Sequence, residues 1–288
     1  MRRNERGIAL IFVLYLLIAL GVLVAEVAQG VRAEAAGVAA IRARSVGRYA
    51  AESGIVIGVV RIHQVMDSAS TVVDRVNGFR DLDADLARTG DNSLGLAKFR
   101  VTVINLNARI DLNRASEPVL AEFFRQFTGR EGMEATLTGL KEEPLRRVGE
   151  LARLPGMDQS LAFAVAPYVT VWGDGLVDIN AAPESVLAAL PEIGQDAAAD
   201  LVRRRESGEV FTSADPFHTA AGRPAGNPDQ AEAGQRAVPI PNVVTLPTRL
   251  LLVSRGWQEG HPLTHEIQAV YSILGQKLVL LSWWERDL

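Results

Sequence analysis

A short basic leader followed by an uninterrupted apolar run constrains this chain more than any other feature. Residues 1–7 carry three arginines, and the run from Ile8 to Ala25 is 18 residues long. A helix rises about 1.5 Å per residue, so the run is just long enough to cross the apolar core of a bilayer, about 30 Å thick. Arginines stay on the cytoplasmic side. The sequence therefore predicts a single-pass membrane protein with a cytoplasmic N-terminus and its bulk on the far side of the membrane.

Three interpretations of this segment compete: a cleaved secretory signal, a plain membrane anchor and a prepilin-type leader. The apolar region of a secretory signal usually spans about 7–15 residues and ends in a small-x-small cleavage site. Here the run is longer, and the residues near its end, from Leu23 to Ala28, make a poor site. The anchor and the prepilin leader remain open at this point.

The helix is predicted to continue far beyond the membrane. No proline occurs before Pro118, and one helix to about Met66 would have 59 residues and a length on the order of 85 Å. Positions mostly three or four residues apart, nearly all of them apolar or small, predict an amphipathic face that packs on a folded domain. An ordinary long surface helix has the same pattern. The positions are Val31, Ala35, Val38, Ile41, Ser45, Tyr49, Glu52, Ile55, Val59 and Ile62.

Two short motifs carry a resemblance to a known family. Arg6-Gly7-Ile8-Ala9-Leu10 precedes the apolar helix, and Arg48-Tyr-Ala-Ala-Glu-Ser-Gly54 follows it. The chain resembles the type IV pilin-like proteins, and in particular the protein K family of minor pseudopilins in type II secretion systems. The resemblance implies that a prepilin peptidase cuts between Gly7 and Ile8, and that Ile8 becomes the N-methylated first residue of the mature chain.

Phe12 departs from the general pilin pattern. Most pilins carry a glutamate four residues after the mature first residue, whereas protein K proteins characteristically lack it. A buried carboxylate needs a cation, which in pili is thought to be the terminal amine of the neighbouring subunit. A subunit with Phe12 avoids this unpaired charge, so the resemblance implies a position at the tip, with nothing above it.

Beyond the helix the chain predicts an α+β fold. Residues 98–110 alternate and are rich in β-branched side chains, and residues 249–254, 265–274 and 277–284 have the same character. The alanine- and leucine-rich segment between them predicts helices inserted into one antiparallel sheet. In order, the predicted segments are a leader over 1–7, a helix over 8–66 with its membrane span at about 8–25, the first part of the pseudopilin α/β domain over 67–110, an inserted α-helical domain over 111–215, a proline-rich loop over 216–247 and closing strands over 248–288.

The inserted domain contains an internal repeat. Residues 111–120 and 178–187 share Asp, Asn, Ala, Glu, Val and Leu in register. Asparagine is a favoured N-cap, and an acidic residue is favoured near a helix start. Asn113 and Asn180 are therefore predicted as helix N-caps, and two similar helix entries explain the repeat.

The second copy continues into a segment that resembles a helix-hairpin-helix motif, here Leu190-Pro-Glu-Ile-Gly194 followed by Leu201-Val-Arg-Arg-Arg205. Such hairpins often bind the DNA backbone, and the arginines have the right charge for phosphates. Acidic Glu192, Asp196 and Asp200 lie among them, and the calculated net charge of the chain is −4. DNA binding is the disfavoured interpretation.

The sequence holds little material for catalysis. It has no cysteine and four histidines, and none of the recognisable nucleophile or phosphate-loop motifs. Asp81-Leu-Asp-Ala-Asp85 opens like an EF-hand, but Leu86 occupies the glycine position, so a solvated loop is the better interpretation. His261 and His265 are predicted at the turn that starts a strand. We expect no enzyme activity and no cofactor or committed metal site, with calcium left open because some protein K members bind it.

The resemblance thus implies a minor pseudopilin at the tip of a type II secretion pseudopilus that initiates assembly and supports protein export across the outer membrane. It also implies that the chain is anchored in the bacterial inner membrane, with its N-terminus in the cytoplasm and its bulk in the periplasm. Its implied partners are the other minor pseudopilins, the major pseudopilin, the inner-membrane assembly platform and the prepilin peptidase. The alternative is a membrane-anchored DNA-binding protein of an uptake apparatus that uses the helix-hairpin-helix. A third interpretation is a pseudopilin of another pilus-like assembly.

Overall fold

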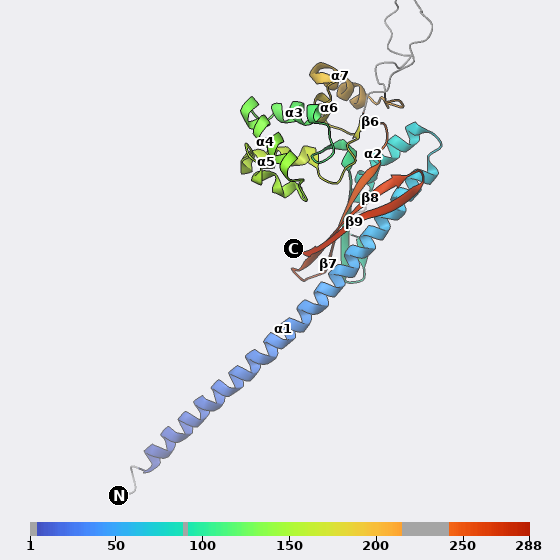
Figure 1. Cartoon of the computed structure of the whole chain (residues 1–288). Coiled ribbons are helices and arrows are strands. Elements are labelled where there is room, and N and C mark those ends of the chain that lie inside the picture. The colour runs from blue at the N-terminus through green and yellow to red at the C-terminus, as the bar shows by residue number, and fades with distance from the viewer. Residues whose placement is uncertain (1–4, 89–91, 215–241) are drawn as a thin grey trace, which may run out of the picture.

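Helix α1 is the longest element of the protein and runs without interruption over Glu5–Ser68. The structure is a computed structural model that describes residues 5–88, 92–214 and 242–288. Residues 1–4 of the leader and most of the predicted proline-rich loop therefore lie outside the described residues. The N-terminal half of α1 projects from the rest of the chain as a single rod, and its C-terminal half lies along one face of a sheet (Figure 1).

The sheet has five antiparallel strands in the order β1-β2-β7-β8-β9. Their bounds are Asn92–Leu94 for β1, Ala97–Asn105 for β2, Arg249–Gln258 for β7, Thr264–Leu274 for β8 and Lys277–Asp287 for β9. Strands β2 and β7 are neighbours along their whole length, although the residues between 105 and 249 separate them in sequence. The predicted α+β fold, with a long helix on an antiparallel sheet and helices inserted between its strands, is confirmed.

Small residues form the face of α1 that packs on the sheet. A Cβ on Gly54 would lie 2.1 Å from the Ser254 hydroxyl, and one on Gly58 would lie 2.8 Å from a Leu252 methyl group. Strand β7 also has a small residue at this contact, because Gly256 lies against Gly47 of α1. The helix and sheet therefore approach more closely than larger side chains would permit.

The amphipathic face predicted for α1 is only partly right. Ile55 and Ile62 are buried in the core between helix and sheet, as predicted, together with Ala51 and Met66. In contrast Val31, Val38, Ile41 and Tyr49 are exposed. Val31, Val38 and Ile41 are exposed because this part of α1 projects beyond the sheet. Tyr49 is exposed because glycine and alanine, which carry little hydrophobic signal, make the close contact with the sheet.

Helix α2, Val72–Arg88, replaces the solvated loop predicted around Asp81–Asp85. Thr71 and Asp74 form a reciprocal cap at its start, in which each backbone N–H donates to the other side chain. Val76, Leu82 and Leu86 are buried. The loop prediction was wrong because these apolar positions repeat with a helical period among the acidic residues.

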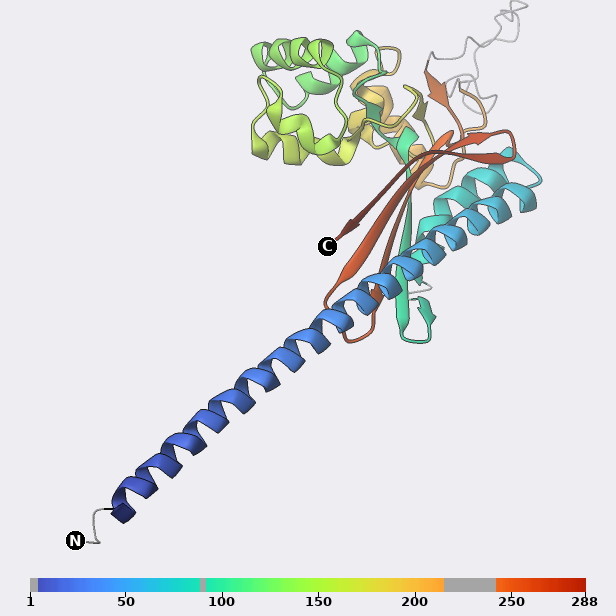
Figure 2. The ribbon, with the colours of Figure 1, turned by 60° about the horizontal axis from the view of Figure 1, so that its bottom comes forward.

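The inserted domain has its own hydrophobic core and forms a lobe separate from the rod of α1 (Figure 2). Its elements are η1 Leu106–Ala108, β3 Ile110–Asp111, α3 Glu117–Arg125, α4 Arg130–Glu142, η2 Val148–Arg153, α5 Gln159–Val165, η3 Ala166–Tyr168, β4 Val169–Thr170, β5 Val177–Asp178, α6 Glu184–Ala188, α7 Gly194–Glu206 and β6 Val243–Val244. Strand β3 pairs with β4 and β5 pairs with β6, both in parallel. Two-residue strands leave no periodicity in a sequence, so these pairs were not predicted.

Asn113 and Asn180 are not helix N-caps, and this prediction is corrected. The N-cap positions of α3 and α6 are Ser116 and Pro183. Each asparagine instead follows an Asx turn, in which the aspartate two residues earlier accepts a hydrogen bond from the asparagine N–H. The chain turns before the helix begins, so the asparagine side chain points to a neighbouring segment instead.

Asn113 and Asn180 each hold a later segment of the chain through the same pair of hydrogen bonds. The Asn180 amide accepts from the Phe211 N–H at 2.9 Å and donates to the Phe211 carbonyl at 2.8 Å. The Asn113 amide accepts from the Leu145 N–H at 3.0 Å and donates to the Leu145 carbonyl at 2.8 Å. The internal repeat therefore encodes a two-bond clamp between an asparagine and a peptide about 30 residues downstream.

Candidate functional site on the N-terminal helix

The first half of α1 is the most apolar surface of the molecule. Residues 10–18, with Phe12 among them, are all exposed large hydrophobics. Over the described residues, one helix, Leu10–Ser68, is long and apolar enough to cross a membrane, and no part of its most apolar stretch is buried. The backbones of Gly7 and Ile8 lie in the first turns of α1, and the structure does not describe the side chain of Ile8.

A second exposed apolar feature continues along α1 beyond that stretch. We call it the uncovered stripe, and it consists of Val31, Val38, Ile41, Tyr49, Val56 and Val60. Tyr49 is 68% exposed and Val56, one heptad later, is 61% exposed. Residues seven apart lie close to the same side of a helix. The stripe therefore presents a row of apolar side chains while glycines of the same helix face the sheet.

Val56 and Val60 belong to the stripe but were missed by the sequence interpretation, which placed the apolar face on Ile55 and Val59 instead. The heptad spacing from Tyr49 to Val56 was the signal that could have found them. Helices dock on one another through apolar positions at this spacing. What the stripe can do chemically is pack against a helix of another protein.

Ion pairs fix α1 on the last strand of the sheet and so hold the stripe in a defined orientation. Arg44 pairs with Asp287 at 2.8 Å and Arg48 with Glu285 at 3.2 Å. His265 lies 2.8 Å from Asp287, and its hydrogen bond, together with Arg44, keeps the pKa of Asp287 below its usual value. His265 lies at the start of β8 and takes part in this network of ion pairs.

The helix-hairpin-helix segment turns between α6 and α7, where Gly194 has a φ of +70°. All three of its arginines have partners inside the chain. Arg203 pairs with Asp200, Arg204 pairs with Glu209 at 2.6 Å, and Arg205 donates to the Ala182 carbonyl at 2.8 Å. This surface therefore offers few uncommitted cations for a DNA backbone.

In the part of the chain that the structure describes, no group of three or more His, Asp or Glu side chains is placed so that it could hold a metal ion. Asp81 and Asp85 lie on α2. His261 lies in the turn before β8, where its ring nitrogen Nδ1 accepts a hydrogen bond from the Leu263 N–H.

The fold and the uncovered stripe define an α+β protein with one candidate membrane-spanning helix and a surface suited to protein contact. Among solved structures, the chain is similar to a chain described as the GspK-GspI-GspJ complex from the enterotoxigenic Escherichia coli Type 2 Secretion System. The two are 15% identical with a TM-score of 0.49, and the match covers 78% of this chain and 95% of that chain. No family model matches the sequence, and no curated protein matches it.

Proposed function

We propose that this chain is a minor pseudopilin of a type II secretion pseudopilus, held in the inner membrane by α1 and placed at the tip. The observation that carries the proposal is the continuity of α1. One helix of 64 residues contains the candidate membrane span, the uncovered stripe and the small-residue face that packs on the sheet. The folded domain and the membrane segment therefore move as one body.

The uncovered stripe is the surface through which assembly proceeds in this proposal. Burial of apolar area contributes about 25 cal/mol per Å², so exposed Val and Ile side chains along several turns supply a substantial driving force for association. A helix from another minor pseudopilin would cover the stripe in the periplasm, and pseudopilin spans would pack on residues 10–25 in the membrane.

Phe12 supports the tip position. It is exposed within the membrane segment, where a general pilin would carry glutamate. A carboxylate in the apolar helix bundle is costly unless a cation pairs with it. A subunit with Phe12 has no carboxylate to pair with a cation, so it is suited to initiate an assembly. Assembly would then proceed with the other minor pseudopilins and the major pseudopilin, on the inner-membrane platform and after removal of residues 1–7 by the prepilin peptidase.

Site-directed photo-cross-linking in cells tests the proposal directly. The chain has no cysteine, so a single substitution Tyr49→Cys or Val56→Cys gives one attachment point for a maleimide–diazirine reagent. Arg130→Cys, with a side chain 88% exposed on the inserted domain, is the matched control. We expect Tyr49→Cys and Val56→Cys to form adducts with other pseudopilins, identified by mass spectrometry, and Arg130→Cys to give far fewer.

Deletion of the genes for the other minor pseudopilins completes this test. The stripe adducts should disappear, and recovery of the chain from membranes should fall. Equal adducts from Arg130→Cys and Val56→Cys, or recovery that is independent of the other minor pseudopilins, would contradict the proposal.

A further inference from the structure

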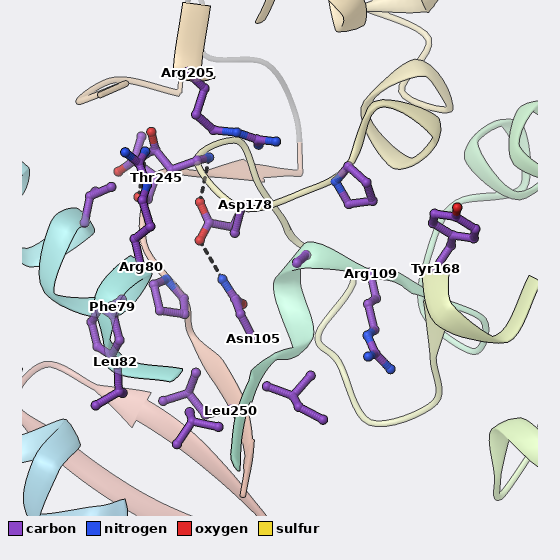
Figure 3. Close-up of a pocket in the computed structure, with 18 of the residues that line it drawn as sticks. Phe79, Arg80, Leu82, Asn105, Arg109, Tyr168, Asp178, Arg205, Thr245 and Leu250 are labelled. Atoms are coloured by element: carbon purple, nitrogen blue, oxygen red, sulfur yellow. Dashed lines mark hydrogen bonds between the residues drawn. The ribbon is translucent and has the colours of Figure 1, made fainter. Parts of the chain in front are cut away.

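A cavity of about 690 Å³ lies where α2, the end of β2 and the inserted domain meet (Figure 3). This volume is within the range of sites that bind small molecules or short peptides. The cavity is remote in sequence from the uncovered stripe on α1, and none of its lining residues belongs to α1. The cavity is therefore a candidate site for a contact other than the one proposed for the uncovered stripe.

Three arginines from three separate elements line this cavity. Arg80 comes from α2, Arg109 follows η1 and Arg205 comes from α7. Figure 3 places Arg80 and Arg205 on either side of Asp178, with Arg109 further along, beside Tyr168. Within the described residues, no carboxylate forms an ion pair with any of these three arginines, whereas many other arginines of the chain have one.

The surroundings of Arg109 and Arg205 make a missing counter-ion costly, whereas Arg80 is exposed. Arg109 is partly buried, and burial lowers its pKa. Burial also lowers the pKa of Arg205, the like charge of Arg80 lowers it further, and the charges of Asp178 and Glu206 offset only part of this. Arg205 is held in place by its bond to the Ala182 carbonyl, so it cannot leave the cavity without loss of that bond. A guanidinium withdrawn from water without an acid partner is a position that an anion stabilises.

Two carboxylates line the cavity but do not pair with the arginines. The Asp178 side chain is occupied by neutral donors, since Oδ2 accepts from Asn105 at 2.8 Å and Oδ1 accepts from the Asn180 N–H at 2.9 Å. Glu206 is exposed and forms no ion pair with a described residue. Arg80 and Arg205 act on Asp178 electrostatically, and Glu206 acts on Arg205, without a direct ion pair. Three positive groups therefore face two negative ones, so one positive charge of the cavity is left without a counter-charge among its lining residues.

The remaining walls are apolar. Val76, Phe79, Leu82, Val103 and Leu250 line the side next to the sheet, and Pro167, Tyr168 and Pro183 line the side next to the inserted domain. A free inorganic anion would leave these walls uncovered. A ligand that fits has carboxylates separated by an apolar body, because the arginines lie at separate points along the cavity.

We infer that this cavity binds an acidic peptide segment of a partner protein, whose carboxylates pair with Arg80 and Arg205 and whose neighbouring apolar side chain fills the space beside Phe79 and Leu250. The carboxylates come either from Asp or Glu side chains or from the C-terminus of the partner. The inference stands apart from the proposed function, because it rests on this cavity and not on α1.

The test uses the full chain in lipid nanodiscs and fluorescence anisotropy with fluorescein-labelled peptides. The first probe is Glu-Leu-Leu-Glu with an amidated C-terminus, the second replaces both glutamates by glutamine, and the third is Gln-Leu-Leu-Gln with a free C-terminus. We expect saturable binding of the first or the third peptide and at least tenfold weaker binding of the second. Preference for the first assigns an acidic side chain as the source, and preference for the third assigns a chain terminus.

Variants locate the binding site. Arg80 is exposed on α2, so Arg80→Gln should leave the fold intact and weaken binding about tenfold, which corresponds to about 1.4 kcal/mol. Arg109→Gln is the second variant and should weaken it in the same direction. Arg203→Gln removes the same charge from α7 outside the cavity and should change the affinity less than twofold. Equal binding of all three peptides, no saturable binding of any of them, or equal weakening by Arg203→Gln and Arg80→Gln would overturn the inference.

Discussion

Gly47 of α1 and Gly256 of β7 are in backbone contact. A Cβ on Gly256 would lie 2.1 Å from the Gly47 carbonyl oxygen and 2.3 Å from the Ala51 nitrogen. Real Cβ atoms never approach backbone atoms so closely, and neither atom belongs to a flexible side chain that could yield. This pair therefore sets how closely the helix lies on the sheet, and with it the orientation of the uncovered stripe.

Gly256→Ala should separate α1 from β7 and lower the free energy of unfolding by about 3 kcal/mol, the upper part of the range for overpacked cores. Chemical denaturation of the full chain in detergent measures this. Gly37→Ala is the matched control on α1, because a Cβ there would meet nothing within 4 Å. It should be neutral or stabilising by up to about 1 kcal/mol, since alanine favours helix over glycine. Equal effects of the two substitutions would contradict the close packing.

Asn180→Ala should cost more stability than Asn113→Ala, although both remove the same two-bond clamp. Asn180 is buried, so its loss leaves the Phe211 peptide without partners at a cost of about 2–4 kcal/mol. Asn113 is exposed, and water can replace it there for about 1 kcal/mol. Denaturation midpoints of the two variants check this, and a larger loss for Asn113→Ala would be the contradictory result.

Asp178 should give the protein a stability that falls as the pH rises. Burial raises the pKa of Asp178 from 3.8 to about 6, in spite of its hydrogen bonds from Asn105 and Asn180. The folded state therefore holds the proton more tightly than the unfolded state. The stabilisation is complete below the unfolded pKa of 3.8 and is lost as the pH rises to about 6, by a total of about 3 kcal/mol.

Asp178→Asn removes this titration. The difference in melting temperature between the variant and the original chain should shift in favour of the variant as the pH rises from about 4 to about 7. Asp111, at the equivalent place in the first repeat, also has its pKa raised by burial, so Asp111→Asn should show the same sign. A difference that stays constant with pH for Asp178→Asn would contradict the account.

Under the proposed function, Phe12→Glu should relax the confinement of this chain to the tip. With a carboxylate that accepts a neighbouring terminal amine, the subunit can enter the shaft, and the number of copies in each pseudopilus should rise. Quantitative mass spectrometry of sheared pseudopili gives the ratio of this chain to the major pseudopilin. Phe12→Leu keeps the position apolar and is the control that should leave the ratio unchanged. An unchanged ratio for Phe12→Glu would contradict tip placement by this residue.

The long helix was predictable from its composition, and the sheet was predictable from the alternation of its strands. The apolar run with no proline before Pro118 predicted α1, and the alternating β-branched segments predicted β2, β7, β8 and β9. The face of α1 that packs on the sheet was not predictable, because Gly47, Gly54 and Gly58 contribute by the absence of a side chain. Helix α2 was missed because its acidic residues outnumber the apolar ones that it buries.

The site was predictable in part. The repeat identified Asn113 and Asn180 as special, but an asparagine two residues after an aspartate serves equally well as a cap or as a clamp. Only the positions of Leu145 beside Asn113 and of Phe211 beside Asn180 distinguish the two. The cavity lined by Arg80, Arg109 and Arg205 had no signal in the sequence, because its walls come from segments that are brought together only by the fold.

The most direct test of the central claim is the N-terminal mass of the full chain recovered from membranes of cells with and without the prepilin peptidase. The account predicts a mature chain that begins at methylated Ile8 when the peptidase is present, and a chain that retains residues 1–7 when it is absent. Retention of residues 1–7 in both strains would contradict the account and would reduce α1 to an ordinary membrane anchor.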